Sequence, residues 1–470
     1  MKSNSGPQRE DSVHASRWLW ILGTGGLLCL LLFVFRPRHQ DRSERVGTAL
    51  SNSATVPAAK GGPATSAGHV RAKSISTPGR TAEEIVSEKV SQFARKQQEI
   101  VADMAKKLKI SVPADMNRFF EAAQAGRWED ATNIFASLQK IRHDTGWERP
   151  TETLWHAVAE TYGVAEQSHN WPAQKLLDYG NAILETLRPG MVYVGGTDAG
   201  RFIPALLTET GEGEAHIVLT QNALADATYL DYLRLRYGDH LNALTPEDSQ
   251  NGFTTYLQDA QKRLQHDQEF PNEPKQLRPG ENIKIIDNRV QVEGQVAVMM
   301  INEQLVQKLL QKNSDLSFAL EESTPLKSLY QGATTLGPVT ELRADTANAL
   351  TPEQAARSLD FWQTTTQNLL TDPEAIGSSI SRDAYAKLIV GQANLFHDRN
   401  LDAEAEQAFQ MANRLSPSQP DALSGYMNLL LDQKRYEDAR QVVQTGLNLA
   451  PDSKQLRELQ AQLNQKEKGK

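Results

Sequence analysis

The carboxyl-terminal part of the chain repeats itself at a fixed period, and this feature restricts the fold more than any other. Residues 386–419 and 420–453 align at a period of 34 residues. Small side chains allow two helices to approach closely, and proline ends a helix. Both kinds of residue recur in register: Ala405 with Ala439, Ala412 with Gly446, and Pro417 with Pro451, while Phe409 aligns with Val443. The period therefore predicts stacked pairs of antiparallel helices.

This pattern resembles the tetratricopeptide repeat, although Gln392 and Met427 stand where that family commonly has a leucine and a small residue. Residues 454–466 are rich in Gln, Lys and Glu, and resemble the solvating cap helix of such arrays. About three repeats are needed to bury a continuous core. We therefore expect helices at 352–370 to supply a third layer within an all-α region at 346–470.

The resemblance implies that the concave face of the array holds a peptide or a helix of a protein partner. The candidate protein-binding residues, taken from the first helix of each repeat, are Lys387, Asn394 and Asn428. The alternative is a purely architectural array that caps its neighbouring domain.

A second helical region is predicted at 81–170. Its segment FFEAAQAGRWEDATNIFASLQK (119–140) is broken at Gly126 and resembles one tetratricopeptide hairpin. The preceding stretch, 81–109, has an apolar heptad seam interrupted by Gln97. That seam either pairs with a second copy, giving an oligomer, or packs on its own domain. The aromatic residues that follow are interpreted as packing anchors, with stacking on a sugar or base as the alternative.

Residues 171–345 switch repeatedly between strand and helix patterns. Short β-rich runs at 191–194, 216–220 and 316–323 are separated by amphipathic helical stretches. The pair 282–286 and 290–294 has the pattern of a hairpin, and a further strand is expected near 336–342. Alternating strands and helices are typical of parallel sheets. The sequence therefore predicts an α/β domain of Rossmann-like, three-layer architecture with a mostly parallel sheet.

Candidate ligand-binding residues follow from this topology, because ligands of such folds lie at the carboxyl ends of the strands. The string GGTDAGRF (195–202) ends the first strand and begins a helix, whose free N–H groups attract anions. Asp198 could cap that helix, accept from a sugar hydroxyl, or hold a cation. The string matches neither GxGxxG nor a P-loop. The candidates are Gly195, Gly196, Thr197, Asp198, Arg201, Gln221 and Asn222, with Glu321, Glu322 and Ser323 after the third strand.

A second resemblance concerns the run from ILETLRPGMVYVGGTDAGRF to DATYLDYL (183–233) and the segment 316–342. Both are similar to the soluble carboxyl-terminal domain of an uncharacterised bacterial membrane family related to protein O-mannosyltransferases. The resemblance implies an α/β fold. The multi-spanning part of that family has no counterpart here, so no transferase activity is implied.

An uncharged apolar run, WLWILGTGGLLCLLLFVF, occupies residues 18–35. Its 18 residues would span roughly 27 Å as a helix, close to the thickness of a bilayer core. We expect a single-pass anchor in the inner or plasma membrane of a bacterium, after a short tail (1–17). Residues 36–80, rich in Ala, Gly, Ser, Thr and Pro, predict a disordered linker. The soluble part is expected to be extracytoplasmic, although the flanking charges do not decide this.

The motifs of common enzyme chemistry are missing from the sequence. There is no GxSxG elbow, and the single cysteine, Cys29, excludes a disulfide scaffold. The net charge of −8 argues against a general nucleic-acid binder. The sequence therefore predicts no catalytic residue, no metal and no cofactor, and leaves open whether the chain is an enzyme.

Together these patterns predict a membrane-anchored scaffold that recruits protein partners through its repeats, in the biogenesis of a bacterial envelope. The alternative is an α/β domain that binds a ligand or glycan at the carboxyl edge of its sheet, in association with glycosyl transfer.

Overall fold

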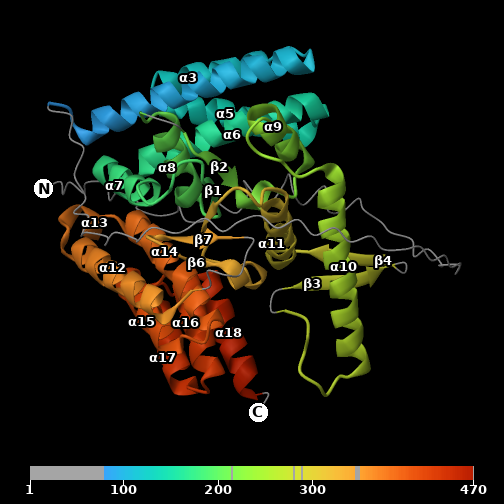
Figure 1. Cartoon of the computed structure of the whole chain (residues 1–470), viewed down its shortest axis with the longest axis vertical. Coiled ribbons are helices and arrows are strands. Elements are labelled where there is room, and N and C mark those ends of the chain that lie inside the picture. Colours follow the sequence, from blue (N-terminus) through green and yellow to red (C-terminus); the bar gives the residue numbers. More distant parts are fainter. Residues whose placement is uncertain (1–78, 213–214, 279–280, 287–288, 344–349, 469–470) are drawn as a thin grey trace, which may run out of the picture.

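The computed structural model describes residues 79–212, 215–278, 281–286, 289–343 and 350–468. The predicted tail, membrane span and all but the last two residues of the predicted linker lie outside these residues. Within the described part, no helix is both long and apolar enough to cross a membrane. This part of the chain is mostly helical, with one five-stranded sheet and one two-stranded hairpin (Figure 1).

The first helical region forms the top layer in Figure 1 and begins with a long helix, α3. Thr81 and Glu84 form a capping box at its start. The predicted heptad seam is buried, with Phe93 and Gln97 at 0 % and Met104 at 2 % exposure. This seam packs on helices of its own chain, which is the second of the two alternatives, and the oligomer is left without support. The helices are α3 (Ala82–Leu108), α4 (Ala114–Gln124), α5 (Trp128–Asp144) and α6 (Arg149–Asn170).

The predicted hairpin at 119–140 is the pair α4 and α5, which turns at Gly126 with a φ of +66°. The Phe135 ring stacks on Tyr162 with centroids 3.8 Å apart and on Trp155 at 5.0 Å. Trp128 stacks on Tyr162 at 5.6 Å. The structure thus confirms packing as the role of these rings, which join α5 to α6.

The five-stranded sheet lies in the middle of the molecule, with strand order β2-β1-β5-β7-β6. One crossover, β1–α8–β2, has the predicted strand–helix–strand form. The elements of this region are α7 (Ala173–Leu184), β1 (Val192–Gly195), α8 (Asp198–Glu209), β2 (Ile217–Thr220), η1 (Gln221–Ala223), α9 (Ala227–Tyr237), β5 (Phe318–Glu321), η2 (Lys327–Gly332), β6 (Thr334–Leu336) and β7 (Val339–Leu342).

The sheet is mixed, and this corrects the predicted Rossmann-like, mostly parallel architecture. β1 pairs in parallel with β2 and β5, whereas β7 pairs antiparallel with both β5 and β6. The single strand expected near 336–342 is in fact two strands joined at Gly337, where φ is +54°. Since a tight turn can join only antiparallel strands, this side of the sheet is built without crossover helices.

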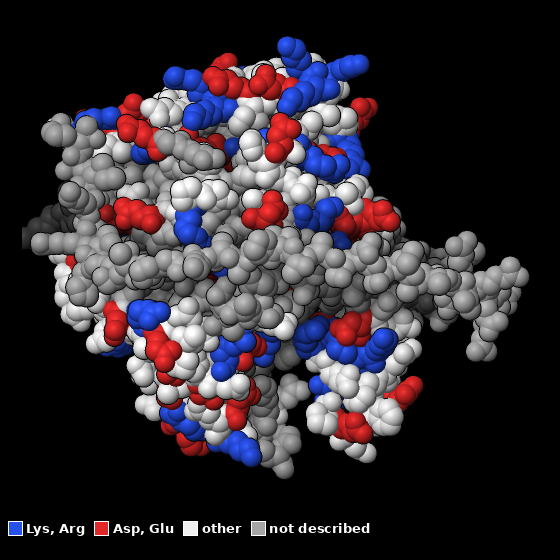
Figure 2. Space-filling view, viewed as in Figure 1, with Lys and Arg blue, Asp and Glu red and all other residues white. Residues whose placement is uncertain are grey.

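An arm extends from the sheet at the lower right of Figure 1. It consists of α10 (Pro246–Glu269), the hairpin β3 (Asn282–Ile286) and β4 (Arg289–Glu293), and α11 (Gln295–Lys312). Arg263 of α10 donates to Glu281 with an Nη2–Oε1 distance of 2.7 Å. Hydrogen bonds from Arg263, Arg278 and Tyr256 outweigh burial and lower the pKa of Glu281 to about 2. Figure 2 shows a notch between this arm and the neighbouring lobe.

The carboxyl-terminal array forms that neighbouring lobe and contains the predicted helix pairs. They are α14 (Ser379–Asp398) with α15 (Asp402–Leu415), and α16 (Pro420–Asp432) with α17 (Tyr436–Leu449), followed by the cap helix α18 (Lys454–Lys468). The expected extra layer is α12 (Pro352–Thr371), which packs on α15 and on β6, with the short helix α13 (Pro373–Gly377) after it. The edge-on contact of Tyr179 with Tyr385, at 5.1 Å, joins α7 to α14.

Gln392 explains why the first repeat departs from the family pattern. Its side chain is 1 % exposed and lies where a leucine is common. Its Oε1 accepts from the Ser358 hydroxyl and from Trp362 Nε1, the latter at 2.9 Å. Its Nε2 donates to the carbonyls of Gly337 at 2.8 Å and Val339 at 3.1 Å. Gln392 therefore links α14 to α12 and to the β6–β7 turn.

Candidate functional site

The candidate site lies where the carboxyl ends of β1 and β5 meet the first helices of the array. On the sheet side, Thr197 caps α8, because its Oγ1 accepts from Gly200 N at 3.1 Å. Asp198 is therefore the first residue of the helix and not its cap. Its Oδ1 instead accepts from Arg201 Nη2 at 2.6 Å. The side chain of Asp198 is 41 % exposed and that of Arg201 only 8 %, so the ion pair spans the boundary between solvent and core.

The glycine-rich loop encloses a carboxylate of the chain itself. Oε2 of Glu321, the last residue of β5, accepts from Gly196 N at 3.2 Å and from Thr197 N at 3.0 Å. Its Oε1 accepts from Thr197 Oγ1 at 2.8 Å. A Cβ added at Gly200 would lie 1.8 Å from Glu321 Oε2. The loop N–H groups that we predicted to face an anionic ligand are thus bonded to Glu321 in this structure.

Burial dominates the titration of this glutamate. Desolvation raises the pKa of Glu321, and the hydrogen bonds from Thr197 and Gly196 with the charge of Lys387 only partly oppose the shift. Hydrogen bonds therefore hold the Glu321 carboxylate in the loop, although burial disfavours its charged form. Such a group is sensitive to any change in the surrounding charges.

The two residues after β2 lie against the same loop. Asn222 Nδ2 donates to Gly196 O at 3.2 Å, and Gln221 is fully buried. Among the described residues, Asn222 Oδ1, both amide atoms of Gln221 and Arg201 Nε are buried without a hydrogen-bond partner. Buried polar atoms are usually paired with protein or with ordered water. This edge of the sheet therefore contains unsatisfied donors and acceptors next to the predicted loop.

Two of the three predicted protein-binding residues face this edge rather than open solvent. Asn394 is 8 % exposed, and its Nδ2 donates to Ser323 O at 2.8 Å. The carboxylates of Asp421, Glu321 and Asp198 raise the pKa of Lys387 although desolvation lowers it. Only Asn428 is exposed. The concave face of the first repeat is therefore occupied by the sheet of the same chain.

Three residues of this junction escaped the sequence analysis. Asp421, at the start of α16, accepts from Ser323 Oγ at 3.0 Å. The position of Asp421 matches that of Lys387 one 34-residue period earlier, so the repeat register could have identified it. Gly391 brings α14 against β5, because a Cβ there would lie 2.6 Å from Glu322 O. Burial and the neighbouring Asp198 raise the pKa of Glu166, on α6, to about 8, and no sequence pattern marks that residue.

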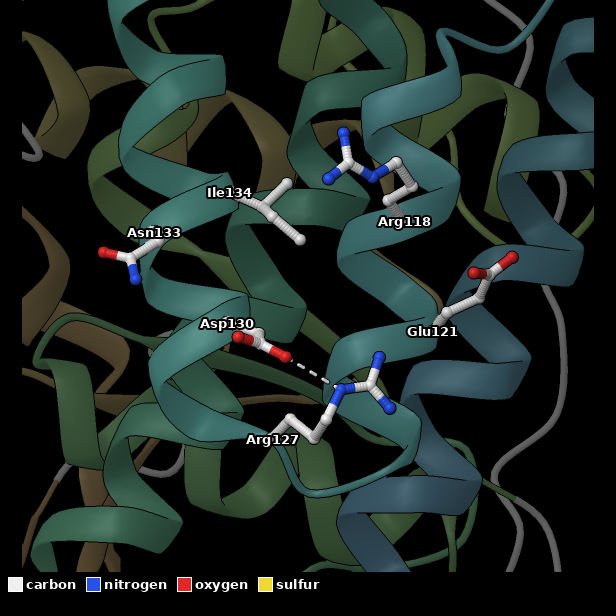
Figure 3. A pocket seen from close by; sticks show the side chains of 6 residues that line it. All are labelled: Arg118, Glu121, Arg127, Asp130, Asn133 and Ile134. Carbon is white, nitrogen blue, oxygen red and sulfur yellow. Dashed lines mark hydrogen bonds and ion pairs between the residues drawn. The ribbon is translucent and has the colours of Figure 1, made fainter.

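A shallow hollow of about 350 Å³ lies elsewhere, between α4 and α5 (Figure 3). Its charged side chains are of both signs, and Arg127 Nε pairs with Asp130 Oδ2 at 2.9 Å. Arg118 and Glu121 line its other side from α4. Within the described part of the chain, no cluster of three or more His, Cys, Asp or Glu side chains could hold a metal ion.

Comparison with known protein families matches residues 403–463 to the tetratricopeptide repeat. The match covers α15 to α18, the second half of the first repeat through the cap helix. No curated protein and no solved structure matches the chain. The resemblance of the central region to a family related to protein O-mannosyltransferases thus finds no support. Tetratricopeptide repeats generally mediate protein–protein contacts, and the match at 403–463 supports an interaction scaffold of that kind.

Proposed function

We propose that this protein is a scaffold that binds a protein partner through its second tetratricopeptide repeat and cap helix, where Asn428 faces solvent although the first turn of α16 contacts Ser323. The observation that carries the proposal is the repeat match at 403–463 together with the unequal exposure of Asn394 and Asn428. These two asparagines occupy equivalent positions, yet one is bonded to Ser323 and the other faces solvent.

The test is co-purification of partners with the full-length chain after mild cross-linking. We expect Asn428→Arg to remove the specific partners, because a long charged side chain would disturb the exposed concave face. The matched control is Asn448→Arg, on α17, where Asn448 is also exposed. Partners that bind equally to both variants would exclude the second repeat as the binding surface.

The apolar run at 18–35 supports the further proposal that the scaffold is anchored in a bacterial membrane and serves in envelope biogenesis. Carbonate extraction of membranes from the native host tests the anchor, because an integral segment resists extraction. Recovery of the intact chain in the soluble fraction would refute it. Alkaline phosphatase fused after residue 470 tests the side of the membrane, since that enzyme is active only when exported.

A ligand-binding role for the sheet edge is the second candidate, and the unpartnered buried atoms of Arg201, Gln221 and Asn222 favour it. Arg201 Nε and the Gln221 amide can donate, and Asn222 Oδ1 can accept, as recognition of a small polar molecule requires. A thermal-shift screen of polar metabolites against the full-length chain and Asp198→Ala tests this role. A compound that stabilises both proteins equally would not bind at this edge.

A further inference from the structure

Glu322 occupies a confined position between the sheet and the array. It directly follows β5, and its Oε1 accepts from Thr324 N at 2.8 Å. On one side, a Cβ added at Gly196 would lie 2.2 Å from Glu322 Oε2. On the other, a Cβ added at Gly391 of α14 would lie 2.6 Å from Glu322 O. Gly196 and Gly391 thus lie close to the side chain and the main chain of the half-buried Glu322, respectively.

The charges that face Glu322 are mostly of its own sign. They come from Glu321 of β5 and from Asp421 at the start of α16, with Lys387 of α14 as the opposing charge and the Tyr330 hydroxyl of η2 nearby. Lys387 also interacts with Asp198, Glu321 and Asp421, so its single positive charge is shared among several carboxylates. Burial, followed by the charges of Glu321 and Asp421, raises the pKa of Glu322 to about 7.

The residue next to Glu322 connects the sheet to both repeats. Ser323 O accepts from Asn394 of the first repeat at 2.8 Å, and Ser323 Oγ donates to Asp421 of the second repeat at 3.0 Å. Gln419 Nε2 also donates to Asp421 Oδ2 at 3.0 Å, and Gln419 Oε1 caps α16 through Ala422 N. A displacement of residues 322–323 is therefore passed directly to the first turn of α16.

We propose that protonation of Glu322 controls how firmly the start of α16, in the second repeat, is held against Ser323 at the end of the sheet. With the proton, Glu322 is neutral and Asp421 stays bonded to Ser323. Without it, the negative charges of Glu322 and Asp421 repel each other beside the hydrogen bond of Ser323 with Asp421, and the start of α16 loosens. The device would alter the presentation of the second repeat, and it stands whether or not that repeat binds a partner.

The test is hydrogen exchange of the full-length chain at pH 6 and pH 8, with each rate divided by the intrinsic rate at that pH. We expect the protection of amides in the first turns of α16 to fall on the order of tenfold at pH 8, the effect of one pKa unit of coupling. Glu322→Gln should keep the protection of pH 6 at both values, because the amide has the shape of the neutral acid. The control Glu458→Gln, an exposed carboxylate of α18, should behave as the wild type.

Asp421→Asn gives a second route to the same answer, because it removes the opposing charge and leaves Glu322 in place. We expect it to reduce the pH dependence of α16 protection even if Glu322→Gln folds poorly. The proposal is overturned if the wild-type protection of α16 is the same at both pH values. It is equally overturned if a folded Glu322→Gln or Asp421→Asn variant keeps the wild-type pH dependence.

Discussion

The two carboxyl-terminal repeats have the same period but opposite surroundings. Asn394 of the first repeat is buried against Ser323, whereas its counterpart Asn428 is exposed. Gly391 lies against the main chain of Glu322, while a Cβ at the equivalent Gly425 would meet the Phe409 ring inside the array, 2.4 Å away. The repeat period therefore determines that a helix pair forms, but it does not determine what that pair contacts. The first repeat packs on the sheet through Asn394, whereas the second contacts Ser323 through Asp421 and leaves Asn428 exposed.

The largest effect should come from restoring the family residue in the first repeat. Gln392→Leu would leave Trp362 Nε1 and the carbonyls of Gly337 and Val339 buried without their partner. At about 1–3 kcal/mol for each such group, we expect the free energy of unfolding to fall by about 4 kcal/mol. Urea denaturation measures this change. The control Gln441→Leu, at an exposed position of α17, should change stability by less than about 0.5 kcal/mol.

Filling the contact between α14 and β5 should have the next largest effect. Gly391→Ala places a methyl group against the main-chain oxygen of Glu322, which cannot rotate away. Overpacking of this kind costs about 2 kcal/mol, and we expect a corresponding loss in the urea midpoint. At Gly377 a Cβ would meet nothing within 4 Å, so Gly377→Ala is the matched control. Equal stability of the two variants would mean that α14 does not pack closely against the main chain of Glu322.

The pH dependence of stability tests the role of Glu322, which lies between the sheet and the carboxyl-terminal array. Because the folded-state pKa of Glu322 is about 7 and the unfolded value is about 4.3, the folded state holds the proton more tightly. The stability that this proton provides is complete at low pH and is lost as pH rises from about 4.3 to about 7. We therefore expect the wild type to lose about 2.5 kcal/mol of stability relative to Glu322→Gln between pH 5 and pH 8. Parallel pH profiles of the two proteins, from urea midpoints, would contradict this.

The smallest effect compares the two asparagines directly. Asn394→Ala removes a buried hydrogen bond to Ser323 O and should cost about 1 kcal/mol. Asn428→Ala changes an exposed side chain, and we expect a change within about 0.5 kcal/mol. Differential scanning calorimetry of both variants measures the difference. A larger loss of stability for Asn428→Ala than for Asn394→Ala would mean that Asn428, and not Asn394, is the asparagine that packs on the sheet.

Much of the secondary structure could be predicted because it depends on local patterns. The strand at 282–286 and the helix at 295–312 are observed at the predicted residues, and the cap helix begins at Lys454 as expected. The pairing of strands could not be predicted in the same way. Gly337 converts one expected strand into a hairpin, and a two-residue turn is a weak signal beside the strong alternation of strands and helices.

The candidate site was only partly predictable for a similar reason. The string at 195–202 was identified from its glycines, and the structure places its first residues at the carboxyl edge of the sheet, with Asn222 bonded to Gly196. Glu321 fills this loop because β1 pairs with β5. The two residues joined by the hydrogen bond from Gly196 N to Glu321 lie 125 positions apart in the sequence. No local pattern carries that information.

The sequence by itself determined the helix pairs of the array, because a 34-residue period of small residues and prolines acts through neighbouring turns of the same chain. Only the tertiary structure decided which repeat is buried, since Asn394 and Asn428 are the same residue at the same position and differ only in what lies opposite. The physical reason is that burial and charge coupling depend on distances in space. Contacts such as that of Ser323 with Asp421 join segments that no period connects.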